Sequence, residues 1–177
     1  MSAGDIRLRP AAESDIDAIQ RIYAHHVATG FASFEELPPD ADEMRRRWRA
    51  IADLGLPYIV ADSAGAIAGF AYAGPYRPRT AYRFAVEDSI YLDPAFQGRG
   101  IGRSLLAALI EQSTGLGKRQ MIAVIGDSAN AASIGLHRSL GFLDTGVFRS
   151  VGFKFGRWVD SVLMQRALGS GDATLPI

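Results

Sequence analysis

The sequence predicts one α/β domain built around a mixed sheet. Its 177 residues suit a single compact domain, since such domains usually hold roughly 100–200 residues. Short runs with strand character alternate with longer runs whose apolar residues recur at helical spacing. No internal repeat, low-complexity tract or linker interrupts this alternation. Residues 1–168 are therefore expected to fold together, whereas 169–177 have little to bury and are expected to form a disordered tail.

The chain begins with a short predicted strand, Ile6–Arg9, in which apolar and basic residues alternate until Pro10 ends the run. A helix is expected to follow, capped by Ser14 and ended by Gly30. One face of this helix gathers the residues expected to be inward: Ile16, Ile19, Ile22, Tyr23, His26 and Val27.

A second helix is expected over residues 42–54, with Met44, Trp48 and Ile51 pointing inward. The next elements are two strands, 58–62 and 66–73, joined by a hairpin turn at Ser63-Ala64-Gly65, and then a Pro- and Arg-rich loop, 74–83. The second half follows a different order: strand 85–92, a glycine-rich loop, helix 100–112, strand 120–125, helix 129–140, and strands near 142–148 and 157–165.

Composition excludes several classes of function. Lys and Arg total 19, as do Asp and Glu, so the net charge is zero and offers no field for nucleic acid or an anionic membrane. Cysteine is absent, which removes disulfides, thiolate nucleophiles and cysteine metal sites. The first ten residues lack the apolar core of a secretory signal, and no run reaches the length of a membrane span. We therefore expect a cytoplasmic protein.

The most informative stretch is the glycine-rich loop and its flanks, Leu92-Asp-Pro-Ala-Phe-Gln-Gly-Arg-Gly-Ile-Gly-Arg103. The order of strand, tight loop and helix aims free backbone N–H groups at whatever lies above the helix start. Glycines allow phosphates to approach the backbone closely. Arg99 and Arg103 are expected to add positive charge at the rim. The pattern therefore predicts a diphosphate site.

Other phosphate loops fit less well. A P-loop ends in Gly-Lys followed by Ser or Thr, and a dinucleotide fingerprint reads Gly-x-Gly-x-x-Gly near a first strand. Neither pattern is present, because the spacing here is Gln97-x-x-Gly100-x-Gly102 in the middle of the chain. The plain alternative is a helix start whose glycines serve only packing.

At this point the sequence resembles a known family. Gln-x-x-Gly-x-Gly between a strand and a helix is similar to the pyrophosphate-binding motif of the GNAT acetyltransferases. The resemblance extends to Val86-Glu-Asp-Ser-Ile-Tyr-Leu92, Asn130-Ala-Ala-Ser-Ile-Gly-Leu-His137 and Leu140-Gly-Phe142. The run Val151-Gly-Phe-Lys-Phe-Gly-Arg-Trp-Val-Asp160 resembles one branch, the phosphinothricin and methionine sulfoximine acetyltransferases. The resemblance as a whole covers nearly the full chain, from residue 6 to about 168.

The resemblance implies a mostly antiparallel mixed sheet that splays at an acetyl-CoA site and carries helices on both faces. It also implies that a strand left unpaired there bonds the pantetheine arm in the manner of an added strand. The residues that the resemblance assigns to acetyl-CoA are Ile90, Tyr91, Leu92, Gln97, Gly98, Arg99, Gly100, Ile101, Gly102, Arg103, Asn130 and Ser133.

Acetyl transfer to an amine needs a base, because the ammonium form must lose a proton. Glu87 resembles the glutamate that serves this role in the family, while strand alternation points Asp88 to the opposite face. His137 is the second catalytic candidate. It shares a helical face with Asn130 and Ser133, although an ordinary surface histidine is an equal alternative.

The acceptor side is assigned to a loop rich in arginine and tyrosine and to two further segments. Arginine forks suit carboxylate, phosphinate or sulfoximine oxygens, and the matching family loop binds the acceptor's acid groups. The candidate acceptor-binding residues are Phe34, Arg77, Pro78, Arg79, Tyr82, Glu87, Asp88, Ser89, Val151 and Phe153. A merely solvated basic loop is the plain alternative.

No metal is expected, because His25 and His26 are adjacent on a helix and no carboxylate stands at ligand spacing. Partners other than the small substrate are expected to be limited to a second copy of the chain. The terminal strands carry many apolar residues, among them Trp158 and Val162, and in the resembling branch this region packs across a twofold axis. A homodimer is thus predicted, with residues 151–153 helping to close the partner's active site.

Two rival functions remain at this level. One is a GNAT enzyme that acts on protein N-termini, ribosomal proteins or aminoglycosides. A basic protein acceptor favours an acidic groove, whereas residues 76–83 hold three arginines. The other is a non-catalytic acyl-CoA sensor, which is expected to have lost the base that Glu87 supplies.

Overall fold

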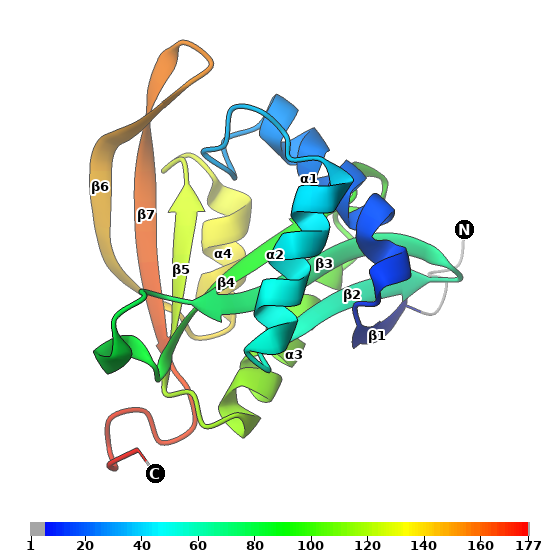
Figure 1. The fold of residues 1–177 in the computed structure, drawn as a ribbon. Coiled ribbons are helices and arrows are strands. Elements are labelled where there is room, and N and C mark those ends of the chain that lie inside the picture. Colours follow the sequence, from blue (N-terminus) through cyan, green and yellow to red (C-terminus); the bar gives the residue numbers. More distant parts are fainter. Residues whose placement is uncertain (1–5, 177) are drawn as a thin grey trace.

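The structure is a computed structural model and describes residues 6–176 (Figure 1). Its strands are β1 (Ile6–Pro10), β2 (Tyr58–Ser63), β3 (Ala66–Pro75), β4 (Ala85–Leu92), β5 (Gln120–Gly126), β6 (Leu143–Lys154) and β7 (Arg157–Ala167). Its helices are α1 (Ile16–Thr29), α2 (Ala41–Asp53), α3 (Ile101–Gly115) and α4 (Ala131–Ser139), and single 3-10 turns are η1 (Glu13–Asp15), η2 (Thr80–Tyr82) and η3 (Pro94–Phe96). Residues 1–5 and 177, which include the end of the predicted tail, lie outside this description.

The strands form one sheet in the order β1-β2-β3-β4-β5-β7-β6. Neighbouring strands are antiparallel except β4 and β5, which run parallel. These two pair only from Ala85 with Gln120 to Asp88 with Ala123. Beyond that point residues 89–92 pair with β3 alone and residues 124–126 with β7 alone. The sheet therefore splits between β4 and β5, which confirms the predicted mixed and splayed architecture.

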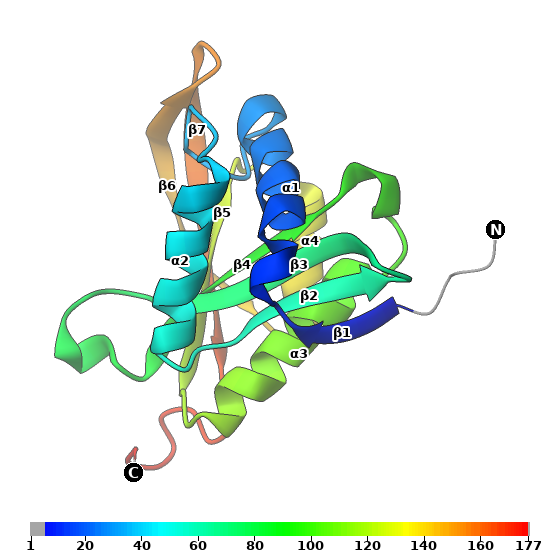
Figure 2. The same cartoon turned by 45° about the vertical axis from the view of Figure 1, so that its right-hand side comes forward.

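Helices cover both faces of the sheet, as predicted. α3 and α4 lie on one face, and α1 and α2 on the other (Figures 1 and 2). Under α3, buried leucines pack against Val86 of β4 and Met121 of β5. Under α1, the isoleucines pack against Val60 of β2 and Phe70 of β3. Burial of apolar side chains is the dominant favourable term in folding, and each face of the sheet has such a core. The two cores hold β4 in the centre of the molecule.

Two hairpin turns have the backbone that a two-residue loop requires. Ala64 and Gly65, in the predicted turn, have φ values of 52° and 92°. Phe155 and Gly156 join β6 to β7 with φ values of 49° and 74°. Positive φ at both positions matches the right-handed twist of the flanking strands. The glycine in each turn adopts this conformation without steric cost.

The start of the first helix differs from the prediction. Ser14 lies inside the turn η1, and α1 begins only at Ile16. Asp15 organises this junction instead, because its carboxylate accepts from the Ala12 N–H at 2.8 Å and from two Arg9 nitrogens at 2.7 and 2.9 Å. A buried acidic residue with a partly exposed arginine partner thus takes the place of the serine cap.

Two further expectations need qualification. Val162 is buried in the core beneath the sheet, whereas Trp158 on the same strand is exposed. It was therefore wrong to count Val162 among the exposed edge residues. The domain boundary at residue 168 stays a prediction. The Arg119 guanidinium donates to Thr174 Oγ1 at 3.0 Å and to the Leu175 carbonyl at 3.1 Å.

Candidate functional site

The split in the sheet opens a cavity of about 490 Å³. One wall is the free part of β4, residues 89–92, and the other is the free part of β5, residues 124–126. The N-terminal half of α4 and the glycine-rich loop complete it. Eleven of the predicted site residues line this cavity together with His26: Asp88, Ser89, Ile90, Tyr91, Leu92, Gln97, Gly98, Gly102, Asn130, Ser133 and His137.

The glycine-rich loop has the backbone of an anion cradle. Gly98 and Gly100 have φ values of 74° and 78°, and Gly100 is the N-cap of α3. A Cβ added to either residue would meet no atom within 4 Å, so the space above them is open. The first N–H groups of α3 point out of the helix here, and its dipole favours negative charge at this end. The loop therefore has the backbone conformation and the open space that binding of an anion requires.

Not every predicted residue of this loop faces the cavity. Ile101 is buried in the core and does not line the cavity, whereas Gly102 beside it does. Arg103 donates to Ser139 Oγ at 2.7 Å on α4. Arg99 donates to the Ala95 carbonyl at 3.0 Å. Both guanidiniums bond to neutral oxygens of the protein and are exposed, and their contribution of positive charge at the rim stays a prediction.

The polar face of α4 turns toward the cavity. Asn130 caps the helix, and its side chain accepts from the Ser133 N–H at 3.2 Å. His137 is buried, so the surface position considered for it is wrong. Its Nε2 lies 2.9 Å from Asp88 Oδ2, and its Nδ1 lies 2.8 Å from the Ser133 carbonyl oxygen. The helix thus presents three polar side chains in a row, and the last is joined to β4.

The contacts of His137 identify its protonation state. A carbonyl oxygen only accepts, so Nδ1 donates to Ser133, and Nε2 then needs its own proton to donate to Asp88. Burial lowers the pKa of His137, but the hydrogen bond and charge of Asp88 outweigh this and raise the pKa above its usual value. The two contacts therefore suit a His137 ring that donates from both nitrogens. Asp88 Oδ1 is also buried and has no hydrogen-bond partner among residues 6–176.

Glu87 lies on the other face of β4. It pairs with Gly74 of β3 and shares its face with Ser89 and Tyr91, toward α1 and α2. Burial raises the pKa of the Glu87 carboxyl, the neighbouring Asp88 charge adds to this, and Arg77 opposes it. A half-buried carboxyl with a raised pKa has the properties of a proton acceptor that works near neutral pH.

The acceptor-binding residues predicted on loops and hairpins form two groups, and these groups lie apart from each other within a single copy of the chain. Arg77 stacks on the Tyr76 ring at 5.0 Å, and the Tyr76 and Tyr82 rings meet edge to face at 5.7 Å. Pro78 and Arg79 are exposed beside them. The second group, Val151 and Phe153, is exposed on the β6–β7 hairpin at the other end of the molecule (Figures 1 and 2).

Phe34 belongs with the hairpin. Its ring lies so close to β6 that a Cβ added to Gly152 would stand 2.6 Å from its Cε2 atom. The same loop, residues 31–34, also passes over the end of β5, because a Cβ on Gly126 would stand 1.9 Å from the Phe31 carbonyl oxygen. The loop between α1 and α2 is thus wedged against the rim of the cavity.

A split sheet, a glycine cradle at a helix start and a carboxyl on the opposite face together match one family. The model of the acetyltransferase (GNAT) family matches residues 19–142. The chain belongs to this family.

Relatives of this GNAT chain include enzymes that act on amino-acid analogues. Phosphinothricin N-acetyltransferase of Alcaligenes faecalis is 57% identical over 169 residues, covering 96% of this chain and 86% of that protein. L-methionine sulfoximine/L-methionine sulfone acetyltransferase of Salmonella typhimurium is 42% identical over 161 residues, covering 91% of this chain and 94% of that protein. The phosphinothricin acetyltransferase of Sinorhizobium meliloti, solved with acetyl-CoA, has a TM-score of 0.94 at 51% identity, covering 97% of this chain and 93% of that one.

Sequence reasoning missed three residues around the GNAT site. His26 lines the cavity and donates from Nε2 to the Leu92 carbonyl at 2.7 Å, while burial chiefly lowers its pKa. Lys154 is buried, and its Nζ donates to the Gly30 and Ser33 carbonyls, each at 2.8 Å. Arg47 binds Glu35 at 2.7 Å and Glu43 at 2.8 Å. The sequence could have indicated that two of them are buried. His26 lies on the apolar face of its helix, and Lys154 stands between two exposed phenylalanines in a strand, where alternation points it inward.

The described part of the chain also bears on metals and membranes. Among residues 6–176, no three His, Asp or Glu side chains gather as a metal site would require. Within the same residues, no helix has the length and apolar character needed to cross a membrane.

Proposed function

We propose that this chain transfers the acetyl group of acetyl-CoA directly to the amino group of a small amino-acid-like acceptor. Phosphinothricin, methionine sulfoximine and methionine sulfone are the candidate acceptors. The observation that supports this proposal most directly is that β4 serves two sites. Its free edge borders the cavity and the glycine cradle, and its face toward α1 and α2 carries Glu87. Relatives whose names give these acceptors support it.

The chain has the groups that acetyl-CoA requires. Gly98 and Gly100 leave open space over the N-terminus of α3 for the diphosphate. The free edge of β4, residues 89–92, offers backbone groups to the pantetheine arm as an added strand would. Asn130 and Ser133 face the same cavity from α4. Acetyl-CoA supplies an activated thioester, and the remaining steps belong to the acceptor and this chain's own side chains.

Glu87 is the proposed general base. It takes a proton from the acceptor ammonium, which frees the nitrogen lone pair to form the new C–N bond as the C–S bond breaks and its electron pair leaves with sulfur. The acylated nitrogen then gives up its second proton, which leaves a neutral amide, and the departing thiolate takes up a proton to become the free CoA thiol. His137 is a weaker candidate for that role, because both of its nitrogens are already engaged in hydrogen bonds, one to the Ser133 carbonyl and one to Asp88. We assign His137 to the cofactor side of β4, where it orders the cavity wall through Asp88.

Arg77 is the proposed contact for the acceptor's acid group. Its charge acts on Glu87, and its guanidinium is held by the Tyr76 ring. Arg79 and Tyr82 extend the same surface. An arginine near the base would orient the acceptor's carboxylate while the base handles the amine.

We further propose a homodimer in which Val151 and Phe153 of one subunit close the acceptor site of the other. Support comes from the hairpin, where Phe148, Phe155 and Trp158 are all more than half exposed at 55%, 54% and 63%. Apolar patches of this kind mark interaction sites, and a twofold axis would use the same patch on both subunits. The cytoplasm remains the proposed location.

Trp158→Glu tests the dimer. We expect a native dimer at micromolar concentration in sedimentation, and a monomer for the variant with a raised KM for the acceptor and an unchanged KM for acetyl-CoA. Leu116→Glu is the matched control, because Leu116 is also exposed but lies at the end of α3. A native monomer with full activity would contradict the proposal.

The activity itself is tested by free-thiol release from acetyl-CoA. The panel contains phosphinothricin, methionine sulfoximine, methionine sulfone, common amino acids, a peptide with N-terminal alanine and an aminoglycoside. We expect release with amino-acid-like acceptors. Release with only the peptide or the aminoglycoside would indicate a different GNAT acceptor. Tight acetyl-CoA binding without release for any acceptor would indicate a sensor.

A further inference from the structure

Ser89 stands where the cavity in the split sheet meets the face of β4 that carries Glu87. Pairing between β4 and β5 ends at Asp88 with Ala123, so Ser89 is the first residue of β4 beyond the split. Ser89 lines the cavity. Because side chains alternate along a strand, its hydroxyl points to the same face as Glu87. Ser89 therefore belongs to both the cofactor side and the acceptor side.

The spacing of Glu87 and Ser89 suits two groups that act on one nitrogen. Residues two apart in a strand lie about 7 Å apart on the same face. A glutamate side chain and a serine side chain span part of that separation, which leaves room for one atom that hydrogen-bonds both. Since Ser89 also borders the cavity, we expect a thioester bound there to bring its sulfur within reach of the same hydroxyl.

Tyr72 of β3 is placed to orient the Ser89 hydroxyl. The two residues pair directly in the β3–β4 register. Burial raises the pKa of Tyr72, and a hydrogen bond with Ser89 opposes this in part. The Tyr58 ring stacks on the Tyr72 ring at 4.9 Å, which restricts its movement. Tyr72 therefore stays un-ionised near neutral pH and gives the serine hydroxyl a fixed partner.

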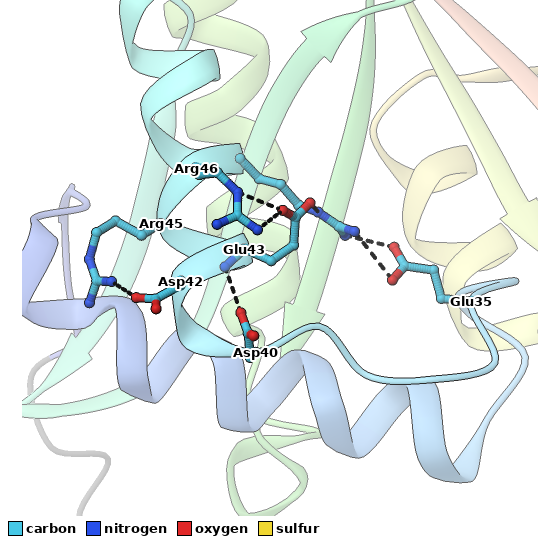
Figure 3. Close-up of polar contacts among 7 residues, drawn as sticks. Glu35, Asp40, Asp42, Glu43, Arg45 and Arg46 are labelled. Atoms are coloured by element: carbon cyan, nitrogen blue, oxygen red, sulfur yellow. Dashed lines mark hydrogen bonds and ion pairs between the residues drawn. The ribbon is translucent and has the colours of Figure 1, made fainter.

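The other charged groups near Tyr72, beyond the proposed base, are Arg47 and Glu35, and they are paired. Arg47 binds Glu35 at 2.7 Å and Glu43 at 2.8 Å. Arg46 also binds Glu43, at 2.7 Å. Figure 3 shows Glu35 on the loop before α2 and Glu43 on the helix, with the bridging guanidinium between them. Guanidiniums do not release a proton and ionised carboxylates only accept hydrogen bonds, whereas a hydroxyl donates and accepts at once.

We infer that Ser89 carries a proton from the acceptor nitrogen to the departing sulfur. This role rests on the proposed function, in which Glu87 takes the first proton from the acceptor ammonium. As the C–S bond breaks, the acylated nitrogen gives its second proton to Ser89 Oγ, and Ser89 passes its own hydroxyl proton to the sulfur. The products are a neutral amide and a free thiol. The hydroxyl ends as it began, and no further acid or base is consumed.

Ser89→Ala removes the proposed carrier, and Ser89→Thr keeps a hydroxyl at the same position. We expect Ser89→Ala to lower kcat by about 10²-fold, with unchanged KM values for acetyl-CoA and the acceptor, and Ser89→Thr to keep most of the activity. The pH profile of kcat should keep its shape, because the carrier does not change its charge. Ser63→Ala is the control, since Ser63 is a half-buried strand serine that does not line the cavity. A raised acceptor KM with full kcat would show that Ser89 only binds the acceptor, and would overturn the carrier role.

A second measurement follows the bound CoA thiol without turnover. The chain has no cysteine, so the ultraviolet absorbance of a thiolate reports on CoA, once the tyrosine absorbance of the same enzyme with desulfo-CoA is subtracted. A hydroxyl that donates to sulfur favours the thiolate and lowers the thiol pKa. We expect a lower thiol pKa in the wild type than in Ser89→Ala, with Tyr72→Phe between them. Tyr58→Phe is the control for Tyr72→Phe, because it removes a hydroxyl from the ring stacked on Tyr72.

The outcomes separate the carrier role from the proposed function. The carrier role requires both the loss of kcat and the rise of the thiol pKa in Ser89→Ala. Acetylation at the wild-type rate by Ser89→Ala, or an unchanged thiol pKa, would overturn the carrier role alone. If the wild type binds CoA but acetylates no acceptor, the proposed function fails and the carrier role fails with it.

Discussion

The cofactor side and the acceptor side of β4 are built in different ways. The cofactor side is a local unit, because residues 89–103 supply the free strand, the glycine cradle and the helix start in one continuous stretch. The proposed acceptor side collects residues from the loop after α1, from the loop before β4 and from the β6–β7 hairpin. The first site depends on backbone conformation, and the second on side chains held by long-range contacts.

The two sites should differ in which amino-acid substitutions they tolerate. A backbone site tolerates few changes, since glycines with positive φ cannot be replaced without strain. A side-chain site can be altered one residue at a time, for example at Phe34 or Arg77, without disturbing the cofactor. Substrate choice can therefore change on this scaffold while acetyl-CoA binding is kept.

Glu87→Gln should give the largest effect. Removing the base is expected to lower kcat by about 10²-fold or more near pH 7, while the KM for acetyl-CoA stays unchanged because Glu87 does not line that cavity. Glu111→Gln, an exposed site on α3, is the control. Retention of full activity at every pH would mean that the base is another residue.

The same substitution should act on stability in the opposite direction. The folded state raises the pKa of Glu87, chiefly by burial, so it binds the proton more tightly than the unfolded state. Stability is therefore lost as pH rises through the folded pKa. Gln removes that loss, and Glu87→Gln should have a higher Tm than the wild type at pH 7 and an equal Tm near pH 4.

Gly100→Val should raise the KM for acetyl-CoA by about 10-fold or more, because a branched side chain strains the positive φ and blocks phosphate approach. Gly117→Val provides the control, since Gly117 also has positive φ and open space around it but follows α3. If both variants lose the same stability but only Gly100→Val raises the KM for acetyl-CoA, the effect belongs to the phosphate site. An unchanged KM would contradict that assignment.

Lys154→Met should act on the acceptor side alone. The substitution leaves the Gly30 and Ser33 carbonyls without their shared donor and loosens the loop that carries Phe34 and Glu35. We expect the KM for the acceptor to rise several-fold, the KM for acetyl-CoA to stay constant, and amide exchange across residues 30–35 to speed up. Lys118→Met, which also removes a lysine–carbonyl bond but at the surface, is the control. A uniform loss of kcat would argue against this positioning role.

The sequence predicted best what is local. The predicted strand 85–92 matches β4 residue for residue, and the glycine loop matches the open cradle before α3. Both follow from the alternation of apolar residues and from the few conformations that glycine allows. The split between β4 and β5 came with the family resemblance, because no single-strand pattern shows where pairing ends.

What the sequence could not predict depends on pairs far apart in the chain. His137 and Asp88 are separated by 49 residues, and Lys154 and Ser33 by 121. Ser14 failed as a cap for a similar reason, since Arg9 on β1 stabilises Asp15 at the helix start instead. Tertiary contacts decide such choices when local preferences are nearly equal.

Asp88→Asn should have the smallest effect on turnover and a distinctive dependence on pH. The pair raises the pKa of His137 in the folded state, so its stabilisation is fully present below the unfolded pKa, near 6.5, and is lost as pH rises through the folded value. We expect the variant to be less stable than the wild type by about 1–3 kcal/mol near pH 6. The difference should shrink by pH 9, where a neutral His137 can accept a hydrogen bond from the asparagine amide. Denaturant unfolding at both pH values measures this, and an equal difference at the two would show that His137 is not the titrating partner.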